Sequence, residues 1–369
     1  MPLSRRDFLG IAPALLAGCA ARKTTIALPT SLTRLARVRV APDRVIRTIV
    51  GLRPFRPSGF VVRGEKFDAK TVIHNYGHGG AGITLSWGTA NLAVEEASKL
   101  DARECAVIGC GVVGLATARS LQQRGYTVSI YTKAMPPDTT SNVAGGLWDP
   151  VTVYSDNHVT PEFRRQFGEA GRFAFRRYQS LTGDLYGVRW MPVYQLSNDS
   201  PHQPPGEQSP YKEIEPLYPE ARQLSSSENP FAAKYAYRRD SMLIEPAIYL
   251  NALIRDFFIA GGKINVREFA EIRDLMSLRE NLIFNCTGLG AKTLFNDGEL
   301  IPIRGQLTFL LPQPEIDYMT VGPGDIYMFP RRDGILLGGT HERGDSRLDP
   351  DPATVDRVLR ENGALFKGV

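Results

Sequence analysis

Short apolar runs alternate with longer segments of helical periodicity over most of the chain. Runs such as 106–108 and 282–288 are continuous and end at glycines, which is typical of buried strands. Strands are expected at 45–50, 106–108, 127–131, 189–196, 263–266 and 282–288, and helices at 86–100, 115–121, 247–260 and 353–365. This alternation predicts an α/β fold. We expect it to begin between Leu32 and Val40.

The glycine pattern Gly-Cys-Gly-Val-Val-Gly at 109–114 lies between a strand and a helix. Gly109 permits a tight turn, Gly111 lets the backbone approach a pyrophosphate, and Gly114 lets helix and strand pack closely. The phosphates would lie at the helix N-terminus. This context favours dinucleotide binding over a chance glycine turn. The predicted cofactor-binding residues of this loop are Gly109, Gly111, Val112, Val113 and Gly114.

A second glycine-rich segment, His-Asn-Tyr-Gly-His-Gly-Gly-Ala-Gly at 74–82, also follows a short strand and precedes a helix. It predicts another backbone cradle at a helix N-terminus. His74 and His78 are metal ligands by type, but no carboxylate or cysteine accompanies them at ligand spacing. We therefore expect no metal site.

Two arginines lie among prolines in Gly-Leu-Arg-Pro-Phe-Arg-Pro at 51–57, which predicts a stiffened turn. A guanidinium held in this way can bind a carboxylate through two hydrogen bonds. From the residues alone, Arg53 or Arg56 is equally well a carboxylate clamp or a surface arginine.

The chain begins with Ser-Arg-Arg-Asp-Phe-Leu at 4–9, an apolar stretch, and then Leu-Ala-Gly-Cys at 16–19. The pattern resembles a twin-arginine export signal that ends in a lipobox, and the apolar run is shorter than the roughly 20 residues of a membrane-spanning helix. The alternative is a buried N-terminal helix with a chance Arg-Arg pair. We expect export to the periplasmic side, cleavage before Cys19, and a lipid on the Cys19 thiol that anchors the protein to the membrane.

Composition sets limits on the class of protein. The 369 residues suggest about two domains, and 43% hydrophobic residues suffice for a sizeable core. The net charge of +5 is modest and the basic residues are scattered, so we expect no nucleic-acid partner. Cys105 and Cys110 lie too far apart along one extended strand to bridge, and we expect no disulfide.

Seven motifs together resemble the D-amino-acid oxidase family of FAD enzymes, over about residues 44 to 360. They lie at 51–57, 74–82, 109–114, 139–148, 285–288, 304–306, and 327–330 with 338–340. The resemblance implies a Rossmann-like FAD-binding domain and a mixed-sheet α+β substrate domain. It also implies that Arg53 and Tyr327 bind the substrate carboxylate and that the Gly80 carbonyl binds the amino group.

One position departs from the usual dinucleotide pattern. Thr132 and Lys133 stand where an acidic, ribose-binding residue is expected about 20 residues after the glycine loop. Lys133 keeps an NADP-type site open, but the segment at 139–148 resembles the flavin loop of the family and favours FAD over a plain capped turn. The further predicted cofactor-binding residues are Gly79, Gly82, Ile83, Thr84, Lys133, Thr139, Thr140, Ser141, Gly145, Gly146 and Leu147.

The order of the motifs is unusual. The family's chain begins with the dinucleotide loop and ends with His-Asn-Tyr-Gly-His-Gly-Gly, whereas here the second precedes the first. The resemblance therefore implies a circular permutation joined through 101–104, the alternative being a gene-assembly error. The predicted parts are an export signal at 1–19, a tether at 20–43, an FAD-binding domain at 44–150 and 240–300, and a substrate domain at 151–239 and 301–369.

By the same resemblance, the expected activity is oxidation of a D-amino acid to a 2-oxo acid and ammonia, with hydride transfer to flavin and reduction of dioxygen to hydrogen peroxide. The alternatives are a flavin dehydrogenase that acts on another amine or imino acid with a membrane acceptor, and a catalytically silent flavin-binding lipoprotein. Asp149 and His341 are weaker pocket candidates, and Tyr327 is alternatively a core aromatic. The glycine-flanked loop at 312–325 is expected to be a lid.

Overall fold

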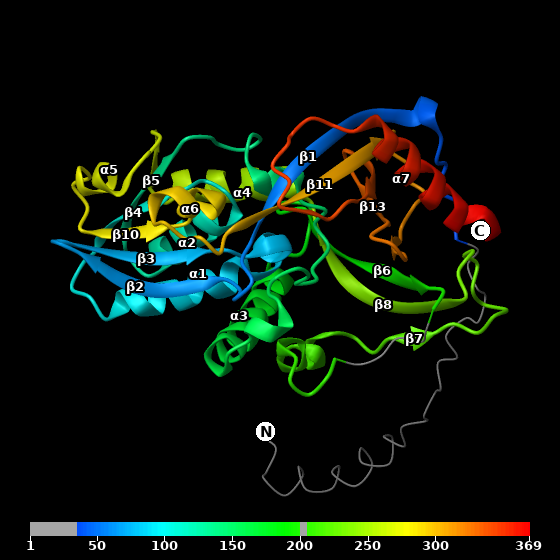
Figure 1. Cartoon of the computed structure of the whole chain (residues 1–369), viewed down its shortest axis with the longest axis horizontal. Helices are drawn as coiled ribbons and strands as arrows, with labels where there is room; N and C mark the ends of the chain where they lie inside the picture. Colours follow the sequence, from blue (N-terminus) through cyan, green and yellow to red (C-terminus); the bar gives the residue numbers. More distant parts are fainter. Residues whose placement is uncertain (1–34, 200–204) are drawn as a thin grey trace, which may run out of the picture. The chain divides into compact units, whose positions relative to one another are not determined.

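The computed structural model of the protein describes residues 35–199 and 205–369. Its strands form two sheets, one of six strands and one of nine. In Figure 1 the six-stranded sheet lies on the left and the nine-stranded sheet on the right. The predicted mixed α/β fold class is confirmed.

The six-stranded sheet is parallel except for one edge strand. Its order is β2 (Val61–Phe67), β3 (Lys70–Tyr76), β10 (Leu282–Asn285), β4 (Glu104–Ile108), β5 (Thr127–Thr132) and β9 (Lys263–Val266), with β2 antiparallel to β3. Cys105 and Val107 of β4 pack in the hydrophobic cluster of α1 (Gly82–Ser98) and α2 (Val112–Gln123). Ala106 and Ile108 pack in a second cluster, with Leu275. Because both faces are covered, the central strands are continuous apolar runs.

The nine-stranded sheet is antiparallel except for the pair β12 and β6. Its order is β1 (Val45–Phe55), β11 (Ile301–Leu310), β14 (Gly334–Gly338), β13 (Tyr327–Arg331), β12 (Met319–Val321), β6 (Val188–Ser197), β8 (Tyr235–Ile244) and β7 (Arg222–Gln223), with β15 (Glu342–Arg343) also on β11. β1 and β11 pair along nearly their whole lengths although they are far apart in the sequence.

The remaining helices cover the sheets or lead into them. They are α3 (Pro161–Ser180), α4 (Pro246–Ile259), α5 (Ile272–Met276), α6 (Ala291–Leu294) and α7 (Pro352–Leu365). α3 crosses α1 closely, since a Cβ on Gly88 would lie 1.9 Å from the Ala170 carbonyl oxygen. α7 begins at a capped turn, because the Asp351 carboxylate accepts a hydrogen bond from the Ala353 amide at 3.1 Å.

Several elements match their predicted positions. The strands expected at 127–131, 189–196 and 263–266 and the helices expected at 247–260 and 353–365 are confirmed to within one residue at each end.

The stiffened turn expected at 51–57 is wrong for its first five residues. β1 continues through Arg53 to Phe55, because Leu52 and Arg53 pair with Arg304 and Ile303 of β11. The helix expected from residue 86 begins already at Gly82. Helix α3 was not expected at all. Pairing with β11 overrides the local preference of 51–55 for a turn. For α3 the local signals are present and were overlooked, since Thr160 caps the helix, Pro161 begins it and its buried residues recur at helical spacing.

The predicted division into domains differs from the arrangement of the sheets. It assigns 44–55 to the cofactor-binding part, whereas β1 belongs to the nine-stranded sheet. It also assigns α3 to the substrate part, whereas α3 packs in the hydrophobic cluster of α1. Local composition does not reveal which sheet a strand joins.

The lid expected at 312–325 is wrong for its first half. The Tyr318 hydroxyl donates to the Ala36 carbonyl at 2.8 Å, and the Arg39 amide donates to the Gln313 side chain at 2.8 Å. Both side chains are buried, so the start of the described chain fixes 313–318 in place. Only 322–325 remain for a movable segment beside Tyr327.

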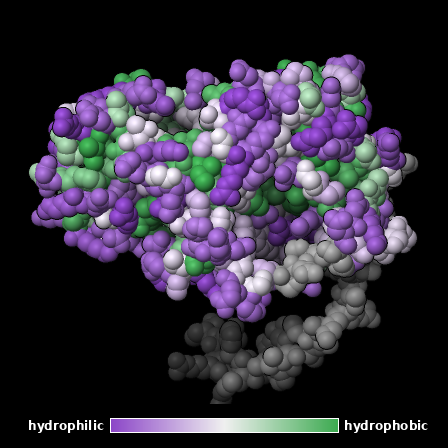
Figure 2. Space-filling view, in the orientation of Figure 1, coloured by the Kyte–Doolittle hydropathy of each residue, from purple (hydrophilic) through white to green (hydrophobic). Residues whose placement is uncertain are grey.

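The predicted export signal, its Cys19 and the first part of the tether lie outside the described residues. No helix within 35–199 or 205–369 is long and apolar enough to cross a membrane. The face drawn in Figure 2 is mostly hydrophilic, with hydrophobic residues visible mainly between polar ones.

Candidate cofactor and substrate site

The glycine loop at 109–114 connects β4 to the N-terminus of α2. Gly109 has φ +110°, and a Cβ on Gly114 would lie 2.0 Å from the Gly109 carbonyl oxygen, so both positions require glycine. Gly111 caps the helix without a side chain, and the first turn holds no acidic residue. The Val112 amide donates to the Ser141 hydroxyl at 2.9 Å. The helix therefore presents an electropositive end, with Val113 and Gly114 completing its first turn.

The second glycine segment forms a similar end at α1. Gly79 has φ +58°, and a Cβ there would lie 1.9 Å from the Thr152 carbonyl oxygen. The Gly80 amide donates to the same carbonyl at 3.1 Å. A Cβ on Gly82 would lie 3.8 Å from the Val112 side chain, which places the starts of α1 and α2 side by side. Neither helix has a side-chain cap or an acidic residue in its first turn.

The segment at 139–148 joins these helix ends to the nine-stranded sheet. The Ser141 hydroxyl contacts the first amide of α2. Ser141 lies in a short 3-10 turn, Thr140–Val143, and the Thr139 hydroxyl donates to the Asn142 side chain of that turn. Gly146 accepts a hydrogen bond from the Ile244 amide at 2.7 Å, and Leu147 bridges to Leu243 of β8. A Cβ on Gly145 would lie 3.7 Å from the Tyr327 ring. The predicted cofactor and substrate residues are thus adjacent here.

Ile83 and Thr84 occupy the first turn of α1. The Ile83 carbonyl accepts a hydrogen bond from the Tyr178 hydroxyl at 2.7 Å. The Thr84 hydroxyl donates to the Asp149 carbonyl at 3.3 Å. Both residues are buried, and these contacts hold the start of α1 against α3 and the segment after Trp148.

Lys133 lies just beyond the end of β5. Its ammonium is 3.7 Å from a carboxylate oxygen of Glu268, and 72% of the side chain is exposed. Exposed ion pairs of this kind are weak. Its predicted contact with a cofactor stays a prediction.

The two histidines of the second segment have structural partners. The His78 ring hydrogen-bonds the Thr89 hydroxyl at 2.8 Å, and the His74 ring lies 3.1 Å from the Asn285 amide nitrogen and 3.2 Å from Glu65. Burial lowers the pKa of His74 to about 4 and that of His78 to about 3. Within the described part of the chain, no group of three His, Cys, Asp or Glu side chains is arranged to hold a metal ion.

Arg53 and Tyr327 meet on the nine-stranded sheet. The Arg53 Nη1 donates to the Thr340 carbonyl at 3.2 Å, and a Cβ on Gly305 would lie 2.5 Å from that nitrogen. The Tyr327 ring packs over Gly338, where a Cβ would lie 2.0 Å from it. Burial raises the pKa of Tyr327, and the nearby Arg53 cation opposes that rise. A cation and a phenol hydroxyl therefore lie together beside the loop at 139–148.

The structure separates the roles of Arg53 and Arg56. Arg56 pairs with Asp297 at 3.0 Å and with Glu299 at 3.2 Å. Among residues 35–199 and 205–369, no carboxylate oxygen lies within 4.0 Å of the Arg53 guanidinium, whose hydrogen bonds go to backbone carbonyls. Arg53 thus keeps its charge available for an anionic ligand.

The two weaker pocket candidates have different surroundings. His341 is exposed, and partial desolvation and the Arg53 cation lower its pKa. Asp149 accepts hydrogen bonds from the Tyr218 hydroxyl at 2.9 Å and from Arg239 at 3.2 Å. The Arg239 guanidinium also lies over the Tyr218 ring at 4.1 Å. Sequence reasoning missed Arg239 and Tyr218, because only the fold brings β8 and a surface loop to Asp149.

Two glycine-led helix ends that lie side by side suit the diphosphate of a dinucleotide. The chain matches the family described as FAD dependent oxidoreductase (DAO) over residues 22–96 and 104–369, and it belongs to this family. Its cofactor is FAD.

Curated relatives agree with this family, and a solved structure agrees in fold. The chain is 31% identical over 268 residues to a D-amino-acid oxidase of Rubrobacter xylanophilus, a match of 70% of this chain and 76% of that enzyme. It is 28% identical over 276 residues to D-aspartate oxidase of Homo sapiens, with 72% and 76% covered. In fold it is similar to glycine oxidase from Geobacillus kaustophilus, with a TM-score of 0.54, 18% identity, and 71% and 78% of the two chains covered.

The residues present fit FAD. The N-termini of α1 and α2 have no acidic residue in their first turns and suit a diphosphate, and added Cβ atoms at Gly109 and Gly114 would collide with backbone oxygens. The residues that would hold it are those of the loops at 79–84, 109–114 and 139–147.

Proposed function

We propose that the protein is an FAD-dependent oxidase of D-amino acids. The observation that carries the proposal is the Arg53 guanidinium, which is hydrogen-bonded to backbone carbonyls and close to the Tyr327 hydroxyl, next to the loop at 139–148. A guanidinium and a phenol provide the donors that an α-carboxylate accepts. Relatives named D-amino-acid oxidase and D-aspartate oxidase support the choice of D-amino acids.

In this proposal the protein positions the substrate and supplies no nucleophile. Arg53 and Tyr327 hold the carboxylate, and the Gly80 carbonyl accepts a hydrogen bond from the amino group. The three groups together aim one Cα hydrogen in a fixed direction. The first-turn amides of α1, at Ile83 and Thr84, stabilise negative charge that develops beside them.

When bound, FAD would supply the acceptor for the Cα hydride and its electron pair, and dioxygen would take up the two electrons with two protons to form hydrogen peroxide. The substrate loses a hydride from Cα and a proton from nitrogen, which gives an imino acid. Water then hydrolyses the imino acid to a 2-oxo acid and ammonia.

Oxygen consumption with paired D- and L-amino acids tests the proposal. The purified protein should be yellow, consume oxygen with several D-amino acids, and form equimolar 2-oxo acid, ammonia and peroxide. Turnover that requires an artificial electron acceptor would favour the dehydrogenase instead. Absence of turnover with any acceptor, despite bound FAD, would favour a catalytically silent protein.

We infer that the chain is a circular permutant of the family fold. The family match is interrupted at 97–103, between α1 and β4, where the two ends of the family's usual chain would be joined. At the other end, a Cβ on Gly363 of α7 would lie 3.7 Å from Val40. New termini close together at the surface are what a permutation requires.

We further propose export and lipid anchoring through the segment at 1–19. The support is the sequence pattern alone, Arg5-Arg6 followed by an apolar run and Cys19. The protein should fractionate with membranes, Cys19→Ser should release it into the periplasm, and Arg5→Lys with Arg6→Lys should retain it in the cytoplasm. A soluble wild-type protein would contradict the anchor.

A further inference from the structure

One short segment, 338–340, lies behind both groups that face the proposed substrate carboxylate. The Thr340 carbonyl accepts the hydrogen bond of Arg53 at 3.2 Å. The Tyr327 ring lies so close to Gly338 that a Cβ there would be 2.0 Å from it, and a Cβ on Gly339 would be 3.0 Å from the Tyr327 hydroxyl. The position of this segment therefore decides where the guanidinium and the phenol stand.

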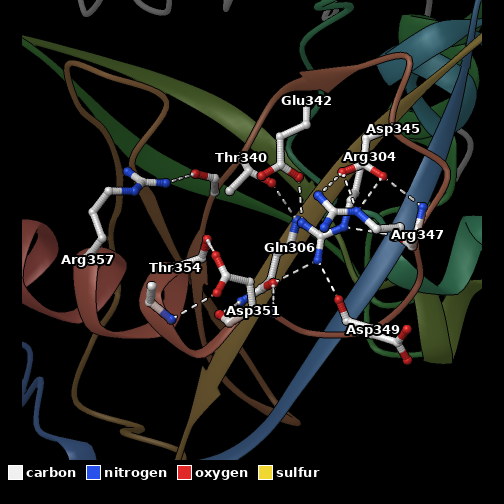
Figure 3. A network of polar contacts seen from close by, with 12 residues as sticks. Arg304, Gln306, Thr340, Glu342, Asp345, Arg347, Asp349, Asp351, Thr354 and Arg357 are labelled. Atoms are coloured by element: carbon white, nitrogen blue, oxygen red, sulfur yellow. Dashed lines mark hydrogen bonds and ion pairs between the residues drawn. The ribbon is translucent and has the colours of Figure 1, made fainter.

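Three further hydrogen bonds fix the segment. The Thr340 hydroxyl accepts a hydrogen bond from the backbone amide of Gln306 at 2.9 Å. The Gly339 carbonyl accepts from Arg357 Nη2 at 2.8 Å, and the Gly338 carbonyl accepts from the Asn362 side chain at 3.3 Å. In Figure 3, Arg357 reaches from α7 toward the strand end that carries Thr340.

Two buried side chains of β11 hold the loop that leads from this segment to α7. Arg304 donates to the carbonyls of Arg347 and Asp349 at 3.0 and 2.6 Å. The Gln306 side chain pairs with the backbone of Asp351, accepting at 2.7 Å and donating at 2.8 Å. Figure 3 shows these contacts as one connected network. Because Asp351 caps α7, the network also sets the position of Arg357.

The alternation of side chains along a strand explains why the network and Arg53 do not collide. Arg304 and Gln306 point to one face of β11, and Gly305 between them exposes bare backbone on the other face. The Arg53 guanidinium occupies that space, since a Cβ on Gly305 would lie 2.5 Å from its Nη1. Residues 304–306 thus leave space for the guanidinium at Gly305, and the backbone amide of Gln306 holds Thr340, whose carbonyl accepts from Arg53.

We propose that Thr340 and Arg357 are positioning residues for the substrate carboxylate, acting through Arg53 and Tyr327 without touching the substrate. The inference rests on the proposed function, because it takes those two groups to be the carboxylate site. It adds that α7, at the end of the chain, tunes affinity for carboxylate ligands.

The Thr340 side chain offers the sharpest test. Thr340→Val keeps the branched shape but cannot accept the Gln306 amide hydrogen, whereas Thr340→Ser keeps the acceptor. The readout is the dissociation constant of benzoate, a simple carboxylate probe, from the change it causes in the visible spectrum of bound FAD. We expect Thr340→Val to raise the dissociation constant of benzoate about five- to tenfold, which is the usual effect of one hydrogen bond. Thr340→Ser should remain within about twofold of wild type.

A double-mutant cycle separates positioning from general weakening. In an Arg53→Met background the Thr340→Val substitution should have a clearly smaller effect on benzoate binding, because one of the two groups through which it acts is gone. Equal effects in both backgrounds would overturn the proposal. So would loss of FAD or of thermal stability in Thr340→Val with an unchanged benzoate constant in the FAD-bound fraction.

Arg357→Met provides an independent variant, with Arg360→Met as its control on the same helix. Arg360 is 70% exposed and pairs with Glu361 at 3.8 Å, whereas Arg357 pairs with the same carboxylate at 2.9 Å. Arg357→Met should raise the KM for a D-amino acid several-fold while Arg360→Met leaves it unchanged, and equal values for the two variants would contradict the proposal. Failure of the wild-type protein to bind benzoate or turn over any amino acid would instead refute the proposed function.

Discussion

In the six-stranded sheet the predicted cofactor contacts come from glycine loops, each of which occupies one short stretch of sequence. In the nine-stranded sheet the predicted carboxylate contacts come from side chains on β1 and β13, which pairing through β11 and β14 brings together. The first half of the site depends on close backbone approach, and the second on sheet register. Substitutions in the first half should therefore reduce FAD binding, whereas substitutions in the second half should reduce activity toward the substrate.

Adding one methyl group at Gly114 should have the largest effect. A Cβ there would lie 2.0 Å from the Gly109 carbonyl oxygen, a backbone atom that cannot move aside. Gly114→Ala should leave the protein colourless or insoluble, since overpacking alone costs roughly 1–3 kcal/mol. Flavin absorbance per mole of protein measures the result.

Gly298→Ala is the matched control, because a Cβ at that position meets nothing within 4 Å. It should retain full FAD. A yellow, stable Gly114→Ala protein would show that β4 and α2 do not pack as closely as described.

Arg53→Met should have the next largest effect, and only on the substrate side. Removing one partner of a buried, charge-assisted contact typically costs 2–5 kcal/mol, so kcat/KM for D-amino acids should fall roughly 10²-fold or more. FAD content should stay unchanged, because the groups expected to hold FAD lie in the glycine loops. Steady-state oxygen consumption with Arg360→Met as control measures the difference, and an unaltered kcat/KM would remove Arg53 from the substrate site.

Sequence reasoning captured these two halves unequally, for the same physical reason. The loop at 109–114 is a local pattern, so its turn, helix start and close packing followed from the order of residues. The residues alone did not distinguish Arg53 from Arg56, and the family resemblance chose Arg53. The structure gives the physical difference, since the carboxylates of Asp297 and Glu299 pair with Arg56. The resemblance to a known family, rather than periodicity, singled out Tyr327.

The buried histidines should make the cofactor half sensitive to acid. The folded-state pKa values of His74 and His78 are about 4 and about 3, below the usual 6.5. As pH falls below 6.5, the unfolded chain binds protons that the folded chain does not. The free energy of unfolding should then drop by up to about 1.4 kcal/mol per pH unit for each histidine, until pH reaches the folded-state values.

Denaturant titrations at several pH values between 7 and 4.5 measure this slope. His74→Gln should reduce the slope of unfolding free energy against pH by the contribution of one proton, whereas His158→Gln, at an exposed position, should leave the slope unchanged. A slope that is the same in His74→Gln and wild type would mean that His74 is protonated in the folded protein.

Restoring the family's usual order should have the smallest effect of all. A chain that begins at Asp101, ends at Leu100 and joins Val369 to Leu35 keeps every pairing in both sheets. Leu35 and Val369 pack against the same hydrophobic cluster. A Gly/Ser linker of about eight residues has an r.m.s. span of roughly 16 Å.

The reordered variant should bind FAD, and its unfolding temperature should lie within a few degrees of that of the wild type. A variant opened between Ala116 and Thr117, inside α2, should do neither. If the reordered chain also failed, the loop at 99–103 would have a role beyond connection, and the permutation would not be a neutral change of chain order.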